Sequence, residues 1–308
     1  MVPSTPSEPV PTRPLGLGDY LPLAKPGITV LICLVAVAGF LLADPRSIDL
    51  LRLGVLVATG ASASAGAAML NHYLDRDIDR RMKRTRGRPL ADEHIVSGST
   101  VAFVGLALLG GGIGAATVLL NPLTGFSIFL GGFTYVGIYT LWLKRRSNWN
   151  IVIGGFAGSA PALAGSAAAV GDWTVGVLAF ALLVFLWTPP HFWSLALLLK
   201  DDFARANLPM LPRMEDVPYS GKVVVVSAAL LIPAAVLIGG SGAVTWPVFV
   251  VLAALGGLFV AMTVPLWSSA TPRNARRVFV FSGPYLLFVV LAIVANVPLV
   301  RVGVPGGF

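Results

Sequence analysis

Residues 71–80 read Asn71-His72-Tyr73-Leu74-Asp75-Arg76-Asp77-Ile78-Asp79-Arg80, and the charged run continues through Arg81-Met82-Lys83-Arg84-Thr85-Arg86-Gly87-Arg88 to Pro89. This stretch holds three carboxylates and seven Lys or Arg side chains, and apolar segments of membrane-spanning length lie on both sides of it. Ionisable groups at the end of a membrane helix are energetically costly and usually functional. We therefore expect a site at a membrane surface, with the rest of the chain folded around it.

The carboxylates of this stretch have a helical spacing. Asn71, Asp75 and Asp79 are four residues apart, so on a helix their side chains form one stripe, and Asp77 lies on the opposite face. Mg²⁺ prefers such oxygen ligands and usually takes one or two carboxylates, with phosphate and water completing its shell. The spacing favours a magnesium–diphosphate site. A solvated loop whose basic residues act only as a topology signal is the alternative that the spacing leaves open.

Basic residues follow the carboxylates at the same spacing. Arg80, Arg84 and Arg88 are again four residues apart, and guanidinium groups hold phosphate oxygens through paired hydrogen bonds. We take Arg84 and Arg88 as the leading candidates for cations that stabilise charge on departing phosphate oxygens.

The composition is that of a membrane protein. The 308 residues are 56% hydrophobic and 12% charged, with a mean hydropathy of +0.82, whereas soluble proteins are about 25% charged. The one cysteine, Cys33, excludes an intrachain disulfide and a cysteine-clustered metal site. The net charge of +8 is better explained by the excess of Lys and Arg in cytoplasmic loops than by nucleic-acid binding.

Apolar runs predict an all-α membrane protein with nine transmembrane helices. Each run is long enough for a hydrocarbon core about 30 Å thick, with turns expected at Asn121-Pro122 and Gly171-Asp172. The expected helices are 28–43, 52–73, 99–119, 123–143, 151–170, 174–197, 222–240, 245–267 and 277–297. They form a single domain over 21–300, between a disordered cytoplasmic tail at 1–20 and a short tail at 301–308.

The distribution of basic residues predicts the orientation. With the N-terminus inside, 19 of the 22 Lys and Arg residues lie on the inner side and only Arg46, Arg52 and Arg301 lie outside. This asymmetry favours a cytoplasmic N-terminus, an external C-terminus and chemistry at the cytoplasmic face. Because residues 1–20 match neither a signal peptide nor a transit peptide, we expect a prokaryotic plasma membrane.

A second polar stretch runs from Trp187 through Pro189-Pro190 and His191 to Asp202. In one helix Trp187, His191 and Asp202 share a face, but the two prolines predict a kink or a helix end. His191 is interpreted either as a structural residue bonded to a carbonyl that the prolines leave free, or as a polar group facing a substrate.

The fourth expected helix ends in aromatic and basic residues. Tyr139, Lys144 and Arg145 lie at its end, where aromatic side chains usually form a belt at the membrane interface. The alternative is that they close over a bound diphosphate. On that alternative, Tyr139, Lys144 and Arg145 are candidate substrate-binding residues.

The run Asn71-xxx-Asp75-xxx-Asp79 resembles the first aspartate motif of the UbiA-type intramembrane prenyltransferases. Residues 71–90, 139–158, 187–197 and 202–212 resemble the haem-modifying branch of that family, and the resemblance extends over about residues 20–297. It implies nine helices around a central cavity and Mg²⁺-dependent transfer of farnesyl from farnesyl diphosphate to a vinyl group of haem b. Addition of water then gives haem O, which haem–copper oxidases require. A haem-delivering protein or haem A synthase is an implied partner.

The resemblance also implies roles for residues. Asn71, Asp75 and Asp79 match the first motif, as metal ligands and catalytic residues, and Asp202 occupies the place of the second, as a candidate substrate-binding residue. The chain departs from the family pattern in three places. Arg205 and Ala206 replace the second aspartate of the second motif, Tyr139 and Lys144 are separated by four residues where the quinone branch often has three, and Asp92-Glu93 stand where glycine is usual. The first departure puts a second, equivalent Mg²⁺ in doubt.

The expected mechanism uses both polar stretches. Aromatic faces such as those of Tyr139 and Trp187 stabilise the allylic cation, and His191 orients haem as an axial ligand or through a propionate. Two rival functions remain. One is prenyl transfer to a quinone or another aromatic acceptor, and the other is transport, although transporters place their sites near the bilayer midplane between repeated halves.

Overall fold

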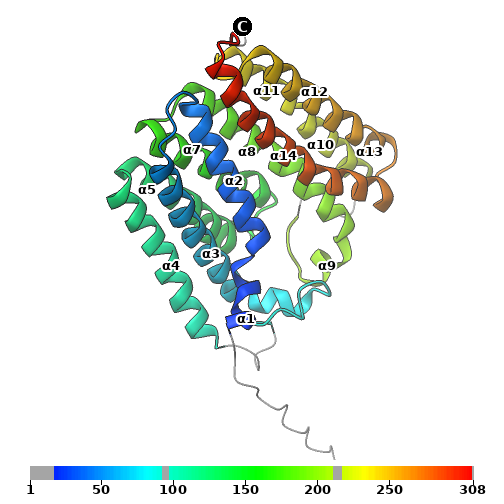
Figure 1. The fold of residues 1–308 in the computed structure, drawn as a ribbon. Helices are drawn as coiled ribbons and strands as arrows, with labels where there is room; N and C mark the ends of the chain where they lie inside the picture. Colours follow the sequence, from blue (N-terminus) through cyan, green and yellow to red (C-terminus); the bar gives the residue numbers. More distant parts are fainter. Residues whose placement is uncertain (1–16, 92–96, 211–216, 307–308) are drawn as a thin grey trace, which may run out of the picture.

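The computed structural model describes residues 17–91, 97–210 and 217–306, and this part of the chain is almost wholly helical (Figure 1). The predicted tails at 1–20 and 301–308 and the departure at Asp92-Glu93 lie partly or wholly outside it. The helices are α1 (Leu17–Tyr20), η1 (Leu21–Ala24), α2 (Pro26–Ala43), α3 (Leu50–Arg81), α4 (Gly98–Leu119), α5 (Pro122–Phe133), η2 (Thr134–Leu143), α6 (Asn150–Gly154), α7 (Phe156–Val170), α8 (Val175–Leu198), α9 (Lys200–Arg205), α10 (Val217–Ala229), α11 (Leu231–Gly240), α12 (Trp246–Thr263), α13 (Pro265–Ser268) and α14 (Pro272–Arg301).

Nine helical segments within the described residues are long and apolar enough to cross a membrane, which confirms the predicted number. They are Leu21–Ala43, Leu50–Leu74, Gly98–Leu119, Pro122–Leu143, Asn150–Val170, Val175–Leu198, Val217–Gly240, Trp246–Ser268 and Pro272–Arg301. Several of these spans combine two shorter elements, as α5 and η2 do in the fourth.

Local sequence chemistry sets the helix boundaries. The side chain of Asn121 accepts a hydrogen bond from the Thr124 amide at 2.8 Å, and Pro122 occupies the first turn of α5. Gly171 ends α7 with φ of 75°, a left-handed conformation that glycine adopts without steric cost. The turns expected at these positions are therefore present.

The prolines of α8 do not end the helix. α8 continues through Pro189-Pro190 to Leu198, so the expectation of a helix end there is wrong. Membrane helices tolerate proline where hydroxyl side chains and neighbouring helices satisfy the backbone. Pro189 and Pro190 remove the amide donors to the Phe185 and Leu186 carbonyls, and in the same turn the Thr188 hydroxyl donates to the Val184 carbonyl at 3.1 Å.

Glycines bring the helices on one side of the bundle into backbone contact. A Cβ atom at Gly165 of α7 would lie 2.1 Å from the Ala36 carbonyl oxygen of α2, and one at Gly66 of α3 would lie 2.4 Å from the Gly105 carbonyl oxygen of α4. Small residues permit such close packing in membranes. α8 lies between this group and the group formed by α10, α11 and α14, and it packs against members of both (Figure 1).

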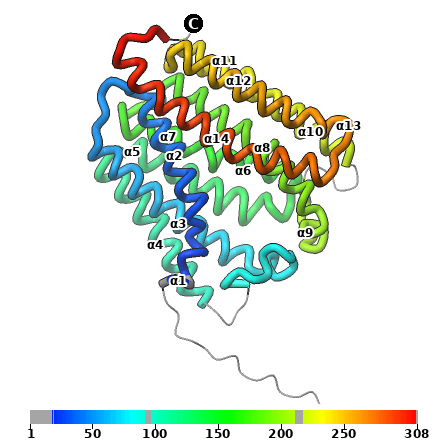
Figure 2. The backbone as a smooth tube through the Cα atoms, turned by 45° about the vertical axis from the view of Figure 1, so that its right-hand side comes forward, coloured from blue at the N-terminus to red at the C-terminus, as the bar shows by residue number. Residues whose placement is uncertain are grey.

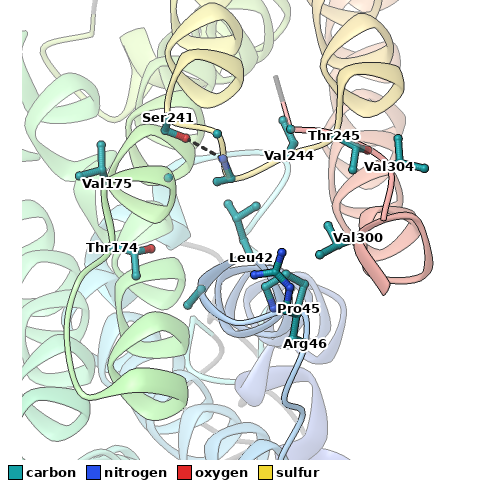
Figure 3. Close-up of a pocket in the computed structure, with 15 residues that line it drawn as sticks. Leu42, Pro45, Arg46, Thr174, Val175, Ser241, Val244, Thr245, Val300 and Val304 are labelled. Carbon is teal, nitrogen blue, oxygen red and sulfur yellow. Dashed lines mark hydrogen bonds between the residues drawn. The ribbon is translucent and has the colours of Figure 1, made fainter. Parts of the chain in front are cut away.

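The two ends of the bundle differ in character. α1, α9 and the turns that follow α3 lie at one end, and the C-terminal residues lie at the other (Figures 1 and 2). A pocket of about 300 Å³ opens near the C-terminal end, between the 42–46 segment, the start of α8, the 241–245 turn and residues after α14 (Figure 3). The charged stretch of α3 thus lies far from this pocket, at the opposite end of the bundle.

Candidate active site

The stripe expected on α3 faces a large internal cavity. Asn71, Asp75 and Asp79 are all buried on this helix, and all three line a cavity of about 850 Å³. The cavity walls are otherwise mostly apolar and come mainly from α2, α3, α5, α7 and α8, with further residues from η2, α6 and α14. The arrangement therefore places a short row of oxygen ligands at the edge of a space suited to a hydrocarbon chain.

Asn71 links three elements through its amide. Lys25 Nζ donates to Asn71 Oδ1 at 2.6 Å and to the Tyr135 hydroxyl at 2.9 Å. Asn71 Nδ2 in turn donates to Asp75 Oδ2 at 2.7 Å and to Thr140 Oγ1 at 3.1 Å. These bonds fix the amide so that its oxygen faces a cation and its nitrogen faces the carboxylate of Asp75.

Asp75 is only 1% exposed, and its two oxygens differ. Lys144 Nζ binds Oδ2 at 2.5 Å, so this oxygen has both an amide and an ammonium partner. Oδ1 is buried and has no hydrogen-bond partner in the described part of the chain. An unpartnered buried carboxylate oxygen is costly, which indicates that a further group binds there.

Asp79 is held by the turns that follow α3. Arg88 Nη1 lies 3.0 and 2.9 Å from its two carboxylate oxygens, and Thr85 Oγ1 donates to its backbone carbonyl at 3.1 Å. Although Arg80, Arg84 and Arg88 are four residues apart, they do not form one helical row, because α3 ends at Arg81 and the chain turns back. Arg84 and Arg88 nevertheless line the cavity, whereas the Arg80 Nε donates to the Ala91 carbonyl at 3.0 Å.

A π-helix brings Tyr139 and Lys144 together. η2 is a π-helical segment, and the Lys144 amide donates to the Tyr139 carbonyl, five residues earlier, at 2.8 Å. Such segments are rare and often occur at functional sites. The wider turn accommodates the extra residue between Tyr139 and Lys144, so both line the cavity, with Lys144 Nζ 5.8 Å from the Tyr139 ring centroid. Trp142 is 56% exposed and fits the interfacial-belt interpretation instead.

Arg145 points away from the cavity. Its guanidinium donates to the two carboxylate oxygens of Asp77 at 2.7 and 2.6 Å and to the Leu74 carbonyl at 3.0 Å. Hydrogen bonding to Arg145 holds the pKa of Asp77 below its usual range, and the same contact raises the pKa of Arg145. Arg145 is not among the residues that line the cavity, so we remove it from the candidate substrate-binding residues. It ties η2 to the outer face of α3.

Asp202 also lies outside the cavity lining. Its carboxylate accepts the backbone amides of Lys83 at 3.1 Å and Arg84 at 3.2 Å, and it pairs with Arg205. Burial acts to raise the pKa of Asp202, but these hydrogen bonds outweigh it, and the pKa lies below its usual value. Asp202 is thus an ionised group that positions the turns carrying Arg84 and Arg88, in place of the expected substrate contact. Arg205, three residues after Asp202, is its ion-pair partner.

His191 and Trp187 face the cavity from α8. The Trp187 indole donates to the Ser282 carbonyl at 3.0 Å, and His191 Nδ1 lies 2.5 Å from Ser282 Oγ. The two rings stack with centroids 4.4 Å apart, and both line the cavity. The partner of His191 is therefore a serine hydroxyl of α14, and not a carbonyl that the prolines leave free.

Comparison with known proteins identifies the family. The family model described as the UbiA prenyltransferase family matches residues 31–294. The chain belongs to the UbiA prenyltransferase family. A protoheme IX farnesyltransferase from Sulfurisphaera tokodaii is 38% identical over 280 residues, which cover 90% of this chain and 92% of the relative. One from Metallosphaera sedula is 42% identical over 276 residues, which cover 89% and 94%.

Solved UbiA structures share the fold. A digeranylgeranylglyceryl phosphate synthase superposes with a TM-score of 0.76 at 16% identity, covering 91% of this chain and 98% of that one. A UbiA homolog from Archaeoglobus fulgidus, bound to DMAPP and Mg²⁺, superposes with a TM-score of 0.68 at 13% identity, covering 91% and 99%. At these identities the likeness concerns the fold alone.

The donor set of this UbiA site suits a magnesium ion. Asp75, Asp79 and Asn71 offer two carboxylates and one amide on one helix face, and Asp75 Oδ1 has no other partner in the described chain. Within residues 17–91, 97–210 and 217–306, no group of three or more His, Cys, Asp or Glu side chains converges on one point. Two carboxylates and one amide are a donor set that Mg²⁺ accepts when substrate phosphate and water complete its shell.

Sequence reasoning missed several residues of the UbiA cavity. Lys25 marks the start of the first span, but it also binds Asn71 and Tyr135. His72 follows Asn71, is buried, lines the cavity and has neither ring nitrogen bonded to a described residue. The available signal for Lys25 was a single cation at the entrance of an apolar helix, where a polar partner is needed.

Replacing Asp202 with alanine should slow prenyl transfer about 100-fold, because a displacement of about 1 Å in positioning groups has an effect of this order. The substitution removes the acceptor of two backbone amides in the turns that carry Arg84 and Arg88. Asp201→Ala is the matched control, because Asp201 is the exposed neighbour. Rates of product formation in detergent check the prediction, and equal rates for both variants would contradict it.

Proposed function

We propose that this chain is a Mg²⁺-dependent protoheme IX farnesyltransferase, which transfers the farnesyl group of farnesyl diphosphate to a vinyl group of haem b and so makes haem O. The observation that carries the proposal is the row of buried carboxylates at the edge of an apolar cavity that basic side chains also line. Relatives of that name, 38% and 42% identical over about nine-tenths of the chain, support the choice of substrates.

The diphosphate end of the cavity is built for a leaving group of high negative charge. Asp75 and Asp79, with Asn71, would hold Mg²⁺, which when bound neutralises charge on the diphosphate as a Lewis acid. Of the residues that the structure describes, four cations line the same cavity: Lys25, Arg84, Arg88 and Lys144. Charge-assisted hydrogen bonds from such groups strengthen as negative charge builds on the departing oxygens.

The apolar part of the cavity suits the isoprenoid. Its walls include Leu31, Val35 and Leu56, and burial of a hydrocarbon chain is favourable by about 0.8 kcal/mol per CH₂. Faces of Tyr139 and Trp187 lie at the same cavity and would stabilise the allylic cation.

In the reaction, the terminal vinyl carbon of haem forms a bond to C1 of the farnesyl group as the C1–oxygen bond breaks and diphosphate leaves. Water then adds to the cation left on the inner vinyl carbon and releases a proton. The product carries a hydroxyethylfarnesyl side chain, and no oxidant or reductant is needed.

The orientation follows from the same charges. We place the N-terminus and the diphosphate site in the cytoplasm, because 19 of 22 Lys and Arg residues then lie inside. We propose a plasma membrane as the location of the chain. In support, α1, α9 and the turns after α3 share one end of the bundle (Figure 1). A tag placed after residue 308 should be accessible only from outside the cell.

Incubation of the purified protein with haem b, farnesyl diphosphate and Mg²⁺ tests the proposal. Extracted pigments, separated by reverse-phase chromatography and weighed by mass spectrometry, should contain a more apolar haem heavier by one farnesyl group plus one hydroxyl group. EDTA should abolish this product, and excess Mg²⁺ should restore it, because the site offers two carboxylates that need the metal to face a diphosphate.

Two outcomes would overturn the proposal. Unchanged haem from folded protein, with farnesylation of a quinone-type acceptor, would assign the same site to another substrate. Movement of a substrate across proteoliposomes without any new product would favour a transporter. The concentration of charge at one end of the cavity argues against transport, since transporter sites lie near the midplane.

A further inference from the structure

We infer that His191 binds the iron of haem b through its Nε2 atom, an assignment that rests on the proposed function and locates the acceptor within the cavity. The inference begins with a chain of hydrogen bonds on α14. Ser282 Oγ donates to the Phe279 carbonyl at 2.6 Å, so the single hydroxyl proton of Ser282 is already used. The contact of 2.5 Å between His191 Nδ1 and Ser282 Oγ therefore requires a proton on Nδ1.

This arrangement selects the tautomer that binds metals. In neutral imidazole, a proton on Nδ1 leaves a lone pair on Nε2. No described residue donates to Nε2, and the His191 side chain lines the cavity. Histidines that bind metals commonly donate their other ring nitrogen to an oxygen acceptor, which fixes the ring and raises its basicity. Ser282 plays this part for His191.

Two aromatic rings hold the imidazole from its faces. The Trp187 ring stacks at a centroid distance of 4.4 Å and an interplanar angle of 17°, and the Phe279 ring at 5.2 Å and 30°. The Trp187 indole also donates to the Ser282 carbonyl at 3.0 Å, so Ser282 anchors both the Trp187 and the His191 rings. This stacking restrains the plane of the imidazole, and no described residue donates to its Nε2 edge.

The surroundings suit a porphyrin and not a second phosphate. Trp187 and Phe279 stack on His191, and the cavity lining also includes Phe192 and Leu286. Apolar surroundings with one histidine ligand are a common haem environment. His191 also lines the cavity that Asp75 and Asp79 line. Iron held at His191 would therefore keep the porphyrin in the space where the farnesyl cation forms.

His72 provides the internal comparison. It lines the same cavity and is buried, but both of its ring nitrogens lack partners among the described residues. Nothing fixes its tautomer, and it neighbours Asn71, at the diphosphate end. The geometry thus distinguishes the two histidines, and assigns iron to His191.

Titration of haem b into the purified full-length protein tests the assignment, with ferrous resonance Raman spectra used to detect an iron–histidine stretching band. The wild type should show the band. His191→Ala should lose it, and added imidazole should restore it. Ser282→Ala should shift the band to lower frequency and weaken haem binding about 10- to 100-fold, the usual effect of removing a partner of a metal-bound histidine. His72→Ala and Asp75→Asn should keep the band.

The outcomes separate this inference from the proposed function. Conversion of haem b by the wild type, with an unchanged band in both His191→Ala and His191→Gln, would overturn iron ligation and leave the farnesyltransferase assignment intact. Loss of the band in His72→Ala, with its retention in His191→Ala, would move the ligand to the other histidine. Failure of the wild type to convert haem b under conditions in which it farnesylates another acceptor would overturn the proposed function itself.

Discussion

Asp75→Asn should lower the rate of farnesyl transfer about 10³-fold or more. Asparagine keeps the shape of the side chain but removes the negative charge that would face Mg²⁺. Lewis-acid stabilisation by a metal contributes several kcal/mol, and each 1.4 kcal/mol is about a factor of ten in rate. Among the described residues, Asp75 Oδ1 is the one buried carboxylate oxygen without a protein partner, so this residue should be more sensitive than any other described carboxylate. Single-turnover formation of the farnesylated haem at saturating Mg²⁺ measures the effect.

Asp77→Asn is the matched control for Asp75→Asn. Asp77 lies two residues away on α3, but its carboxylate binds Arg145 on the other side of the helix. Its substitution should change the rate by less than about twofold, because a partly exposed ion pair contributes little. A comparable loss in both variants would contradict a specific role for Asp75.

Stability needs a separate check, because Asp75 is the partner of Lys144. Removing one member of a buried ion pair leaves an uncompensated charge and costs about 3–5 kcal/mol. Asparagine retains an oxygen that can accept from Lys144, which makes it preferable to alanine. If Asp75→Asn unfolds in detergent, the double variant Asp75→Asn/Lys144→Gln removes both charges and should fold while remaining inactive.

The fold was predictable because each helix that crosses a membrane must meet requirements that its own sequence shows. A helix that crosses lipid must satisfy its own backbone and present about 20 apolar residues, so counting apolar runs found the nine spans that the described residues contain. The path of α8 through Pro189-Pro190 was not predictable in this way. It depends on how the assembled bundle accommodates the Phe185 and Leu186 carbonyls, which the prolines leave without an amide donor.

The candidate site also has one part that the sequence predicts and another that it does not. The face shared by Asn71, Asp75 and Asp79 follows from helical periodicity alone, and the structure places all three at the cavity. The contacts of Arg88 with Asp79 and of Asp202 with the turns after α3 depend on where α3 ends and how the chain returns. Beyond Arg81, where α3 ends, a spacing of four residues therefore no longer predicts which side chains share a face.

Lys144 and Arg145 show why neighbouring residues are hard to separate from sequence. Successive helical side chains point in directions about 100° apart, so one of the two faces the cavity and the other does not. The π-helical turn of η2 decides which, since it aligns Lys144 with Tyr139. The available signal was the one extra residue between Tyr139 and Lys144, and π-helices are too rare to be predicted from such a signal.

Arg88→Gln should reduce the turnover number about 10²- to 10³-fold, the usual effect of removing one donor that stabilises charge in a transition state. One nitrogen of Arg88 contacts both oxygens of Asp79, so the other guanidinium N–H groups remain for diphosphate oxygens at the cavity. The loss should fall mainly on kcat, because leaving-group charge is largest in the transition state. Steady-state kinetics with farnesyl diphosphate as the varied substrate separates kcat from KM.

Arg86→Gln is the control, because Arg86 is an exposed arginine of the same turns and does not line the cavity. Its kinetics should match the wild type within about twofold, as for other surface charges. Arg88→Lys tests the chemistry further: a lysine keeps the charge but lacks the planar set of donors. It should therefore recover only part of the lost rate. Full recovery in Arg88→Lys would show that Arg88 acts only through its positive charge. An equal loss in Arg86→Gln would show that the structure of the turns, and not the Arg88 guanidinium at the cavity, limits the reaction.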